Sequence, residues 1–291
     1  MTLERLRIFV AVAEREHVTA AARALNLTQS AVSNAIAALE TEHDVHLFDR
    51  VGRGVVLNQT GRAFLPEAKA VLARATAAEA ALADMSALRR GRLAIFASQT
   101  IASAWLPRRL AAFHAAYPGV ELDVAIGNTR EAAEAVLSGA AELGLVEGEI
   151  DQPMLEQTVV GSDRLAVLVT PDHPWAGVRR LEAATLATQA WVLREAGSGT
   201  RSTLEAALRR AGVDPQTLSI AMTLPSNEAV LAAAEAGAGA TALSESVAYA
   251  SVAAGRLVMA DFTLPERPFR LLRHSERYRS KAGDAFVEAV G

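Results

Sequence analysis

The 291-residue sequence contains no cysteine, which excludes disulfides, thiolate metal sites and cysteine nucleophiles. Aromatic residues make up only 5 % of the chain. No stretch approaches the roughly 18 uncharged apolar residues that a membrane span needs. Charged residues at Glu4, Arg5 and Arg7 interrupt the apolar N-terminus, so we expect no secretory signal peptide and a cytoplasmic address. The six histidines are scattered and form no metal-ligand pattern, so neither a metal ion nor a cofactor is expected.

Neither sign of charge dominates the chain. Residues 1–90 hold 11 basic and 10 acidic side chains, and residues 91–291 hold 18 basic and 23 acidic ones. The slightly basic N-terminal part is the better candidate for contact with nucleic acid, but its excess of one charge is a weak signal. With 51 % hydrophobic and 21 % charged residues, the composition is typical of folded domains. The length allows two or three of them.

Common catalytic motifs are also missing. The sequence has no G-x-S-x-G nucleophile elbow, no Walker A loop and no H-E-x-x-H zinc motif. The segment Gly237–Ala242 matches a G-x-G-x-x-A dinucleotide pattern, but it follows a predicted helix, whereas the Rossmann fingerprint follows a strand. We therefore expect a protein that is not an enzyme.

The first forty residues predict three short helices. Residues 4–15 place apolar side chains at helical spacing on one face. A second helix is expected behind Thr19 as N-cap, running to Leu25. Asn26 is suited to a left-handed turn, and Thr28 can cap a third helix over residues 29–41.

The third predicted helix has two contrasting faces. One face is apolar and would pack on the first two helices: Val32, Ala35, Ile36 and Leu39. The opposite face is short, neutral and hydrogen-bonding: Ser30, Ser33, Asn34 and Ala37. A solvated face usually carries Lys and Glu, whereas a face of this kind can approach base edges in a major groove. Helix, tight turn and helix together predict a helix-turn-helix, although three ordinary packed helices would give a similar pattern.

A predicted hairpin follows the helices. Residues 46–50 and 53–57 form two short β-like runs around the turn Val51–Gly54. Such a wing would present Arg50 and Arg53 to phosphates or a minor groove. The alternative is a surface hairpin with solvated arginines.

These segments resemble the LysR-type transcriptional regulators. The resemblance lies in the runs 20–33 (AAARALNLTQSAVS), 39–40 (LE), 47–50 (LFDR) and 57–61 (LNQTG). It implies that the third helix enters the major groove with Gln29, Ser30, Ser33 and Asn34 near the bases, while Arg50 and Arg53 serve the wing. The sequence departs from the family at Asn34, where arginine is frequent, and at Asp44, where glycine is usual. A base preference at Asn34 is therefore not implied.

A long helix is expected from Thr60 to about Leu88, followed by a hinge at residues 86–92. Its apolar residues alternate steps of four and three, which is the seam of a coiled coil. The seam comprises Phe64, Ala68, Val71, Ala75, Ala78, Leu82 and Met85. Pairing of two chains would present two recognition helices to a near-palindromic site. The alternative is a helix packed on its own domain.

In the last two hundred residues, apolar strands alternate with helices. Strands are predicted at 93–97, 120–126, 143–146, 164–169 and 191–193, and helices at 106–117, 130–138, 203–211 and 229–236. This alternation is typical of an α/β domain with mostly parallel sheets. Two such lobes joined by crossing strands would form a hinged clamshell.

Two loops in this region are candidates for a ligand site. Ser98-Gln99-Thr100 and Gly197–Arg201 each follow a strand and open a helix, where hydroxyls and free N–H groups attract anions. Glycines 197 and 199 would let the backbone approach the ligand closely. Simple N-capping is the alternative for each loop taken singly. Asn128, Thr129 and Glu147 also follow strands; Glu147 would oppose an anion unless a cation such as Arg201 paired with it.

The family resemblance extends here, through 194–201 (REAGSGTR) and 236–244 (AGAGATALS). It implies a two-lobe effector domain of the periplasmic-binding-protein-like fold. The first motif is similar to the branch that regulates carbon fixation and sulfur metabolism, which implies a small anion as effector, such as a sulfur oxyanion or a phosphorylated metabolite. The residues implied to contact it are Ser98, Gln99, Thr100, Asn128, Thr129, Glu147, Ser198, Gly199, Thr200 and Arg201.

The sequence thus predicts a winged helix-turn-helix domain (1–59), a linker and dimerisation helix (60–88) and an effector domain (89–291). Its lobes are expected at about 92–162 with 266–291, and at about 163–265. The leading hypothesis is a homodimeric or homotetrameric regulator that binds double-stranded DNA, a small effector and RNA polymerase, with no membrane contact. The alternatives are a solute-binding protein with a helical N-terminal extension and an enzyme that acts on a small anion.

Overall fold

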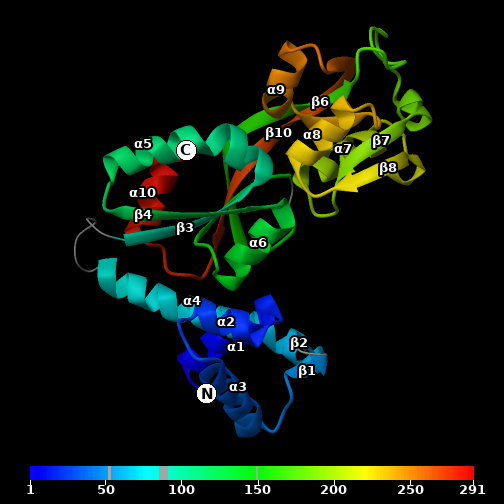
Figure 1. Ribbon diagram of the computed structural model, residues 1–291. Helices are drawn as coiled ribbons and strands as arrows, with labels where there is room; N and C mark the ends of the chain where they lie inside the picture. Colours follow the sequence, from blue (N-terminus) through cyan, green and yellow to red (C-terminus); the bar gives the residue numbers. More distant parts are fainter. Residues whose placement is uncertain (52–53, 85–90, 149) are drawn as a thin grey trace. The chain divides into compact units, whose positions relative to one another are not determined.

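The computed structural model describes residues 1–51, 54–84, 91–148 and 150–291, and it divides into two compact units (Figure 1). The first consists mainly of residues 1–86, and the second comprises residues 87–137 and 141–291. Arg53 and most of the expected hinge, residues 86–90, lie outside the described residues.

Three helices form the core of the first unit: α1 (Leu3–Arg15), α2 (Val18–Ala24) and α3 (Gln29–His43). The Thr28 hydroxyl accepts from the backbone N–H of Ala31 at 3.2 Å, which confirms the predicted cap of α3. Asn26 adopts φ 55°, the predicted left-handed conformation. The cap predicted for α2 is wrong. His17 Nδ1, and not Thr19, accepts from the first turn, because α2 begins one residue before Thr19.

Two short strands complete the winged fold, β1 (Phe48–Val51) and β2 (Gly54–Leu57), which pair antiparallel. Two residues of the family-like motifs hold this arrangement from inside the protein. Glu40 accepts from the backbone N–H of Leu47 at 2.7 Å. At Gly61, an added Cβ would lie 2.1 Å from the Leu47 carbonyl oxygen. These two motif residues therefore hold the segment before β1 in place.

The helix α4 (Gln59–Asp84) carries the predicted coiled-coil seam, and the seam residues differ in their burial. Phe64 and Ala68 pack into the core of their own unit, together with Phe9 of α1. The prediction that they face a second chain is therefore wrong, because α1 already covers that side of α4. Val71 is 41 % exposed, and Ala78 is exposed as well. Met85 and the side chain of Leu82 lie outside what the structure describes.

Asp44 ends α3 in a left-handed conformation, with φ 53° and ψ 46°, at the position where the family usually has glycine. The turn thus keeps its shape, and Asp44 pays a conformational penalty and places a negative charge at a helix C-terminus. We expect Asp44→Gly to stabilise the first unit by about 1 kcal/mol. Hydrogen exchange of the α3 amides would measure this. Ala37→Gly, inside the same helix, should instead accelerate exchange. If Asp44→Gly does not slow the exchange of these amides, the prediction is contradicted.

A six-stranded sheet of order β4-β3-β5-β10-β6-β9 runs through the second unit (Figure 1). Its strands are β3 (Gly91–Ser98), β4 (Val120–Gly127), β5 (Leu143–Glu147), β6 (Leu155–Val169), β9 (Thr241–Ser244) and β10 (Val258–His274). The long strands β6 and β10 pair antiparallel along almost their whole length and connect the two lobes. The predicted crossing strands are thereby identified. The residue boundaries of the lobes stay a prediction.

In the first lobe, helices cover both faces of β3, β4 and β5. Helices α5 (Leu106–Ala116) and α10 (Lys281–Val290) pack on one face through Phe113 and Phe286. Helix α6 (Thr129–Ser138) packs on the other face through Ala132 and Val136. Between β3 and α5 lies a π-helical turn, η1 (Ile101–Trp105), a form that is frequent at functional sites.

The second lobe adds a parallel pair, β7 (Ala190–Arg194) and β8 (Ser219–Leu224). Helix α7 (Gly199–Arg210) packs on a core around Trp175 and Trp191, and helices α8 (Asn227–Glu235) and α9 (Glu245–Ala253) pack on a second core. Two short 3-10 turns, η2 (Ala183–Thr188) and η3 (Pro215–Thr217), complete this lobe. Gly239, from the rejected dinucleotide pattern, lies against the Ala190 backbone, where an added Cβ would be 2.5 Å from the carbonyl oxygen.

Candidate functional site

The neutral face of α3 is exposed and its opposite face is buried. Gln29, Ser30, Ser33 and Asn34 are all exposed, whereas Val32 and Leu39 are at most 1 % exposed. Ala35 and Ile36 are partly buried and pack with the same core. The helix is therefore held from behind while its small polar side chains remain accessible, which is what insertion into a major groove requires.

The wing presents Arg50 on β1, where its side chain is exposed. Arg53 was predicted to act beside it and lies outside the described residues. Exposed Val51 follows Arg50, so the described part of the wing combines one cation with one apolar side chain.

The first predicted ligand loop lies at the carboxyl ends of adjacent strands. Ser98 ends β3 and Glu147 ends the neighbouring parallel strand β5, and the Ser98 hydroxyl donates to Glu147 Oε2. Thr100 is 1 % exposed and makes no capping bond, so the simple N-cap does not account for it. The Gln99 amide crosses to the second lobe, where it donates to the Pro225 carbonyl and accepts from the Asn227 N–H, both at 2.9 Å.

The second loop opens α7 and meets the first lobe. Ser198, Gly199 and Thr200 are all buried, and Ser198 makes no capping bond. A Cβ at Gly199 would lie 2.1 Å from the Glu147 carbonyl oxygen and 2.6 Å from Thr129 Oγ1. In the structure this glycine therefore makes its close approach to the opposite lobe, and its predicted approach to a ligand stays a prediction. Thr129 also donates to the Glu147 carbonyl, at 2.9 Å.

A cation absent from the sequence prediction lies where these two loops meet, at the interface between the lobes. Arg267 of β10 is paired with Asp163 of β6 in register, and its Nε and Nη2 donate to the two carboxylate oxygens at 2.5 and 2.8 Å. Its Nη1 lies 3.6 Å from Glu147 Oε1 and 3.2 Å from Thr200 Oγ1. Glu147 is thus paired with a cation, but this cation is Arg267 and not Arg201, which the sequence had offered as a candidate. Arg201 Nε donates instead to Glu205, one turn along α7.

A second polar network links the lobes beside Arg267. Arg194 is buried and donates to Asn227 Oδ1 at 2.5 Å, and the Asn227 amide donates to Thr100 Oγ1 at 3.2 Å. Asn128 of the first lobe donates to Glu195 at 3.2 Å. Burial disfavours ionisation of Glu195, but hydrogen bonds from Arg194, its own backbone and Asn128 outweigh that effect and lower its pKa.

Comparison with known proteins identifies this architecture. Residues 3–62 match the model of the bacterial regulatory helix-turn-helix protein, lysR family, and residues 86–291 match the LysR substrate binding domain. This chain belongs to the LysR family of transcriptional regulators. The RuBisCO operon transcriptional regulator of Allochromatium vinosum is 32 % identical over 100 % of this chain and 95 % of the relative.

Solved structures agree with the fold of this LysR-type regulator. Full-length CbnR, in a complex with its target DNA, superposes with a TM-score of 0.70 at 24 % identity, covering 100 % of this chain and 99 % of CbnR. The regulatory domain of CcmR from Synechocystis PCC6803, in complex with 2-PG, has a TM-score of 0.63 at 25 % identity. It covers 69 % of this chain and 96 % of that domain.

The sequence analysis did not predict several polar residues at the interface between the regulator's lobes. The residues not predicted are Asp163, Arg194, Glu195, Asn227 and Arg267. Arg194 and Glu195 belong to a motif that was recognised, so their position within it was an available signal. Arg267 offered little signal, since a charged residue in an alternating strand usually faces solvent. In the structure it is 2 % exposed and lies opposite Asp163 on β6.

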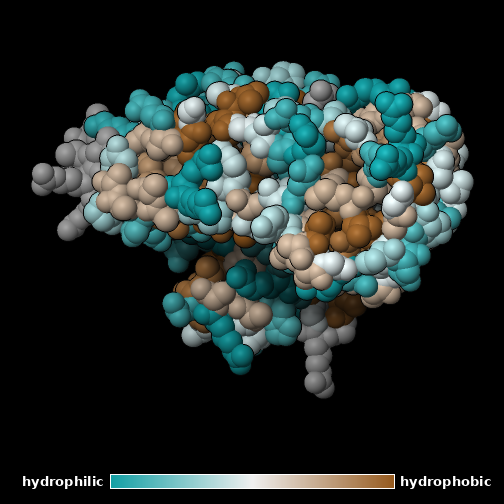
Figure 2. All heavy atoms as spheres, turned by 90° about the horizontal axis from the view of Figure 1, so that it is seen from above, coloured by the Kyte–Doolittle hydropathy of each residue, from teal (hydrophilic) through white to brown (hydrophobic). Residues whose placement is uncertain are grey.

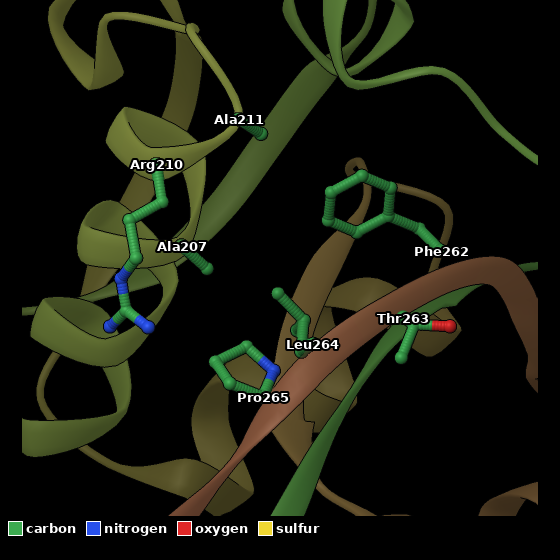
Figure 3. A pocket seen from close by; sticks show the side chains of 7 residues that line it. All are labelled: Ala207, Arg210, Ala211, Phe262, Thr263, Leu264 and Pro265. Atoms are coloured by element: carbon green, nitrogen blue, oxygen red, sulfur yellow. The ribbon is translucent and has the colours of Figure 1, made fainter.

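The regulator also has an open cavity away from this interface. It has a volume of about 400 Å³ and lies between the end of α7 and β10, and none of the predicted effector residues lines it. Its walls are mostly apolar: Ala207, Ala211, Phe262, Leu264 and Pro265. Figure 3 shows the Arg210 side chain extending along one side of this group. Nothing in this cavity resembles the polar network between the lobes.

Among the residues that the structure describes, no group of three or more His, Asp or Glu side chains is placed to hold a metal ion. No described helix combines the length and apolar character needed to cross a membrane.

Proposed function

We propose that this LysR-type regulator binds double-stranded DNA through α3 and the wing, and that a small anion bound between the lobes of the second unit changes this binding. The observation behind the DNA part is the exposed, neutral face of α3 with Gln29, Ser30, Ser33 and Asn34. Arg50 and Arg53 would contact the backbone or the minor groove. In this proposal the protein acts in the cytoplasm, contacts RNA polymerase, needs no cofactor and catalyses no reaction.

The proposed effector site is the lobe interface around Arg267. The proposed contacts from the first lobe are Ser98, Gln99, Thr100, Asn128, Thr129 and Glu147, and those from the second lobe are Ser198, Gly199, Thr200 and Arg201. Of these, Glu147, Thr100 and Thr200 contact Arg267 itself. A guanidinium, several hydroxyls and the N-terminus of α7 suit an oxyanion. The 2-PG complex of the CcmR domain supports a ligand of this class in a related fold.

We further propose a homodimer or homotetramer. Besides Val71 of α4, two edge strands expose apolar side chains: Ile126 of β4 is 60 % exposed, and Ile220 and Met222 of β8 are 42 % and 46 % exposed. Figure 2 shows hydrophobic patches among polar residues on the face in view. Unpaired apolar edges favour association, and a dimer would supply two recognition helices.

The function is tested by mobility shift of the full-length protein on the intergenic DNA upstream of its own gene, with and without 2-PG or inorganic phosphate. We expect binding to this DNA over a scrambled duplex of equal length, and a change in affinity or footprint length with the anion. Binding of the anion without any DNA affinity would favour a solute-binding protein. Turnover of the anion would favour an enzyme.

Thr100→Val and Ser198→Val separate the effector site from the DNA site. Thr100 Oγ1 is buried between Asn227 and Arg267, so its loss removes the acceptor of the Asn227 amide without changing the shape of the side chain. We expect each variant to weaken anion affinity roughly tenfold or more, with DNA affinity retained. Calorimetric titration measures the first and mobility shift the second. Thr158→Val, at an exposed position of β6, is the matched control. Unaltered anion affinity in both variants would move the site elsewhere.

A further inference from the structure

One buried cation at the interface between the lobes, Arg267, is shared by two buried carboxylates. The side chain of Arg267 is 3 % exposed, that of Glu147 is 3 % exposed and that of Asp163 is 7 % exposed. Asp163 engages the Nε and Nη2 edge of the guanidinium in a bidentate pair, which leaves the Nη1 edge toward Glu147. The triad therefore holds one positive and two negative formal charges.

The sheet register explains why these side chains meet. Arg267 is directly opposite Asp163 on β6, and Phe269, two residues along β10, is directly opposite Glu147 on β5. Residues two apart on a strand share a face, so Arg267 and Glu147 lie diagonally across neighbouring strands. The arrangement belongs to the backbone of the sheet and does not depend on a loop.

The Glu147 carboxylate has the surroundings of a bound anion. Its Oε2 accepts from the Ser98 hydroxyl, and its Oε1 faces Arg267 at 3.6 Å. The guanidinium also lies within hydrogen-bonding distance of Thr100 and Thr200, at 3.5 and 3.2 Å. These hydroxyls come from the two loops that the proposed function assigns to the effector.

Two other arginines at the interface between the lobes are already engaged. Arg194 donates to Glu195 through Nε and Nη2, and to Asn227 through Nη1. Arg201 donates to Glu205 and to the Arg194 carbonyl. An anion that entered with Glu147 still in place would meet an unbalanced negative charge in a buried site, where repulsion is poorly screened.

We propose that Glu147 is a built-in competitor of the effector: its carboxylate occupies the place of the effector's anionic group on Ser98 and Arg267, and it must leave that place when the anion binds. This inference rests on the proposed anionic effector and deepens it. The measured affinity for the effector then reflects the difference between two free energies, that of the anion in this site and that of the Glu147 carboxylate in the same site. An anion binds only if its interaction with Ser98 and Arg267 is more favourable than that of the Glu147 carboxylate.

The test uses calorimetric titration of full-length wild-type protein and Glu147→Gln with 2-PG and with inorganic phosphate. The glutamine keeps the shape and can still accept from Ser98, but it no longer competes as a charge for Arg267. We expect Glu147→Gln to bind the anions roughly tenfold tighter or more. Its mobility-shift response should occur at correspondingly lower anion concentration. Glu156→Gln, which removes an equal charge from an exposed pair with Arg279, should leave the affinity unchanged.

Equal or weaker anion binding by Glu147→Gln than by the wild type would overturn the inference while leaving the proposed function intact. If neither protein binds either anion, and operator binding responds to neither, both the inference and the anionic effector fail. A gain of affinity in Glu156→Gln equal to that in Glu147→Gln would reduce the effect to net charge and overturn the inference.

A second measurement does not depend on a variant that folds. In a crystal structure of the wild type soaked with 2-PG, we expect an anionic oxygen on Ser98 Oγ and Arg267, with the Glu147 carboxylate moved out of hydrogen-bonding distance of Ser98. An anion elsewhere in the cleft, with Glu147 still on Ser98, would overturn the inference.

Discussion

Replacing Arg267 with methionine is expected to lower the free energy of unfolding of the second unit by about 3–5 kcal/mol. Methionine matches the length of the arginine stem but leaves Asp163 and Glu147 buried without a cation. Breaking a buried pair costs far more than the pair contributes, because a charge left in a poorly solvated site has no compensation. Such a loss is a large part of the stability of a typical domain.

Tryptophan fluorescence during urea unfolding measures this effect in the full-length chain. The three tryptophans, Trp105, Trp175 and Trp191, all lie in the second unit, so the signal reports on that unit alone. Arg279→Met removes the cation of an exposed pair with Glu156 and should cost less than about 1 kcal/mol. The triple variant Arg267→Met, Asp163→Asn, Glu147→Gln should recover much of the loss. A cost for Arg267→Met no greater than that for Arg279→Met would contradict this account of the cleft.

Ser33→Arg is expected to abolish preferential binding to operator DNA, with a loss in specific affinity of roughly tenfold or more. Ser33 lies in the middle of the exposed face of α3, where a short side chain lets the helix approach the base edges. An arginine there would hold the helix away from the groove floor. Its charge would still attract phosphates, so non-specific binding should persist and its salt dependence should steepen by about one unit.

Mobility shift at several salt concentrations, on operator and scrambled duplexes, separates the two effects. Ala116→Arg adds the same charge at an exposed position of α5 in the second unit and should leave operator affinity unchanged. The circular dichroism melting curve of Ser33→Arg should match that of the wild type, because the side chain is not part of the core. Unchanged preference for the operator would show that this face of α3 does not contact the bases.

The sequence predictions succeeded to different extents in the two units, for a physical reason. In the first unit, the two faces of α3, the Thr28 cap and the left-handed Asn26 follow from residues within a few positions of one another. Local spacing determines which side of a helix is apolar, so these features could be predicted. The prediction that α4 pairs with a second chain was wrong at Phe64 and Ala68, which pack in the core of their own unit. An apolar stripe can be covered by another chain or by its own domain, and the sequence pattern is the same in both cases.

For the second unit, the sequence by itself determined the alternation of strands and helices and the two loops at the carboxyl ends of strands. It also predicted that the loops of Ser98 and Thr100, and of Gly199 and Thr200, would lie together, as they do. Only the tertiary structure decided that Arg267, 104 residues from Asp163 and 120 from Glu147, is the cation between the lobes. That pairing depends on the register of β10 against β5 and β6, which is set by packing over the whole sheet and leaves no local trace in the sequence.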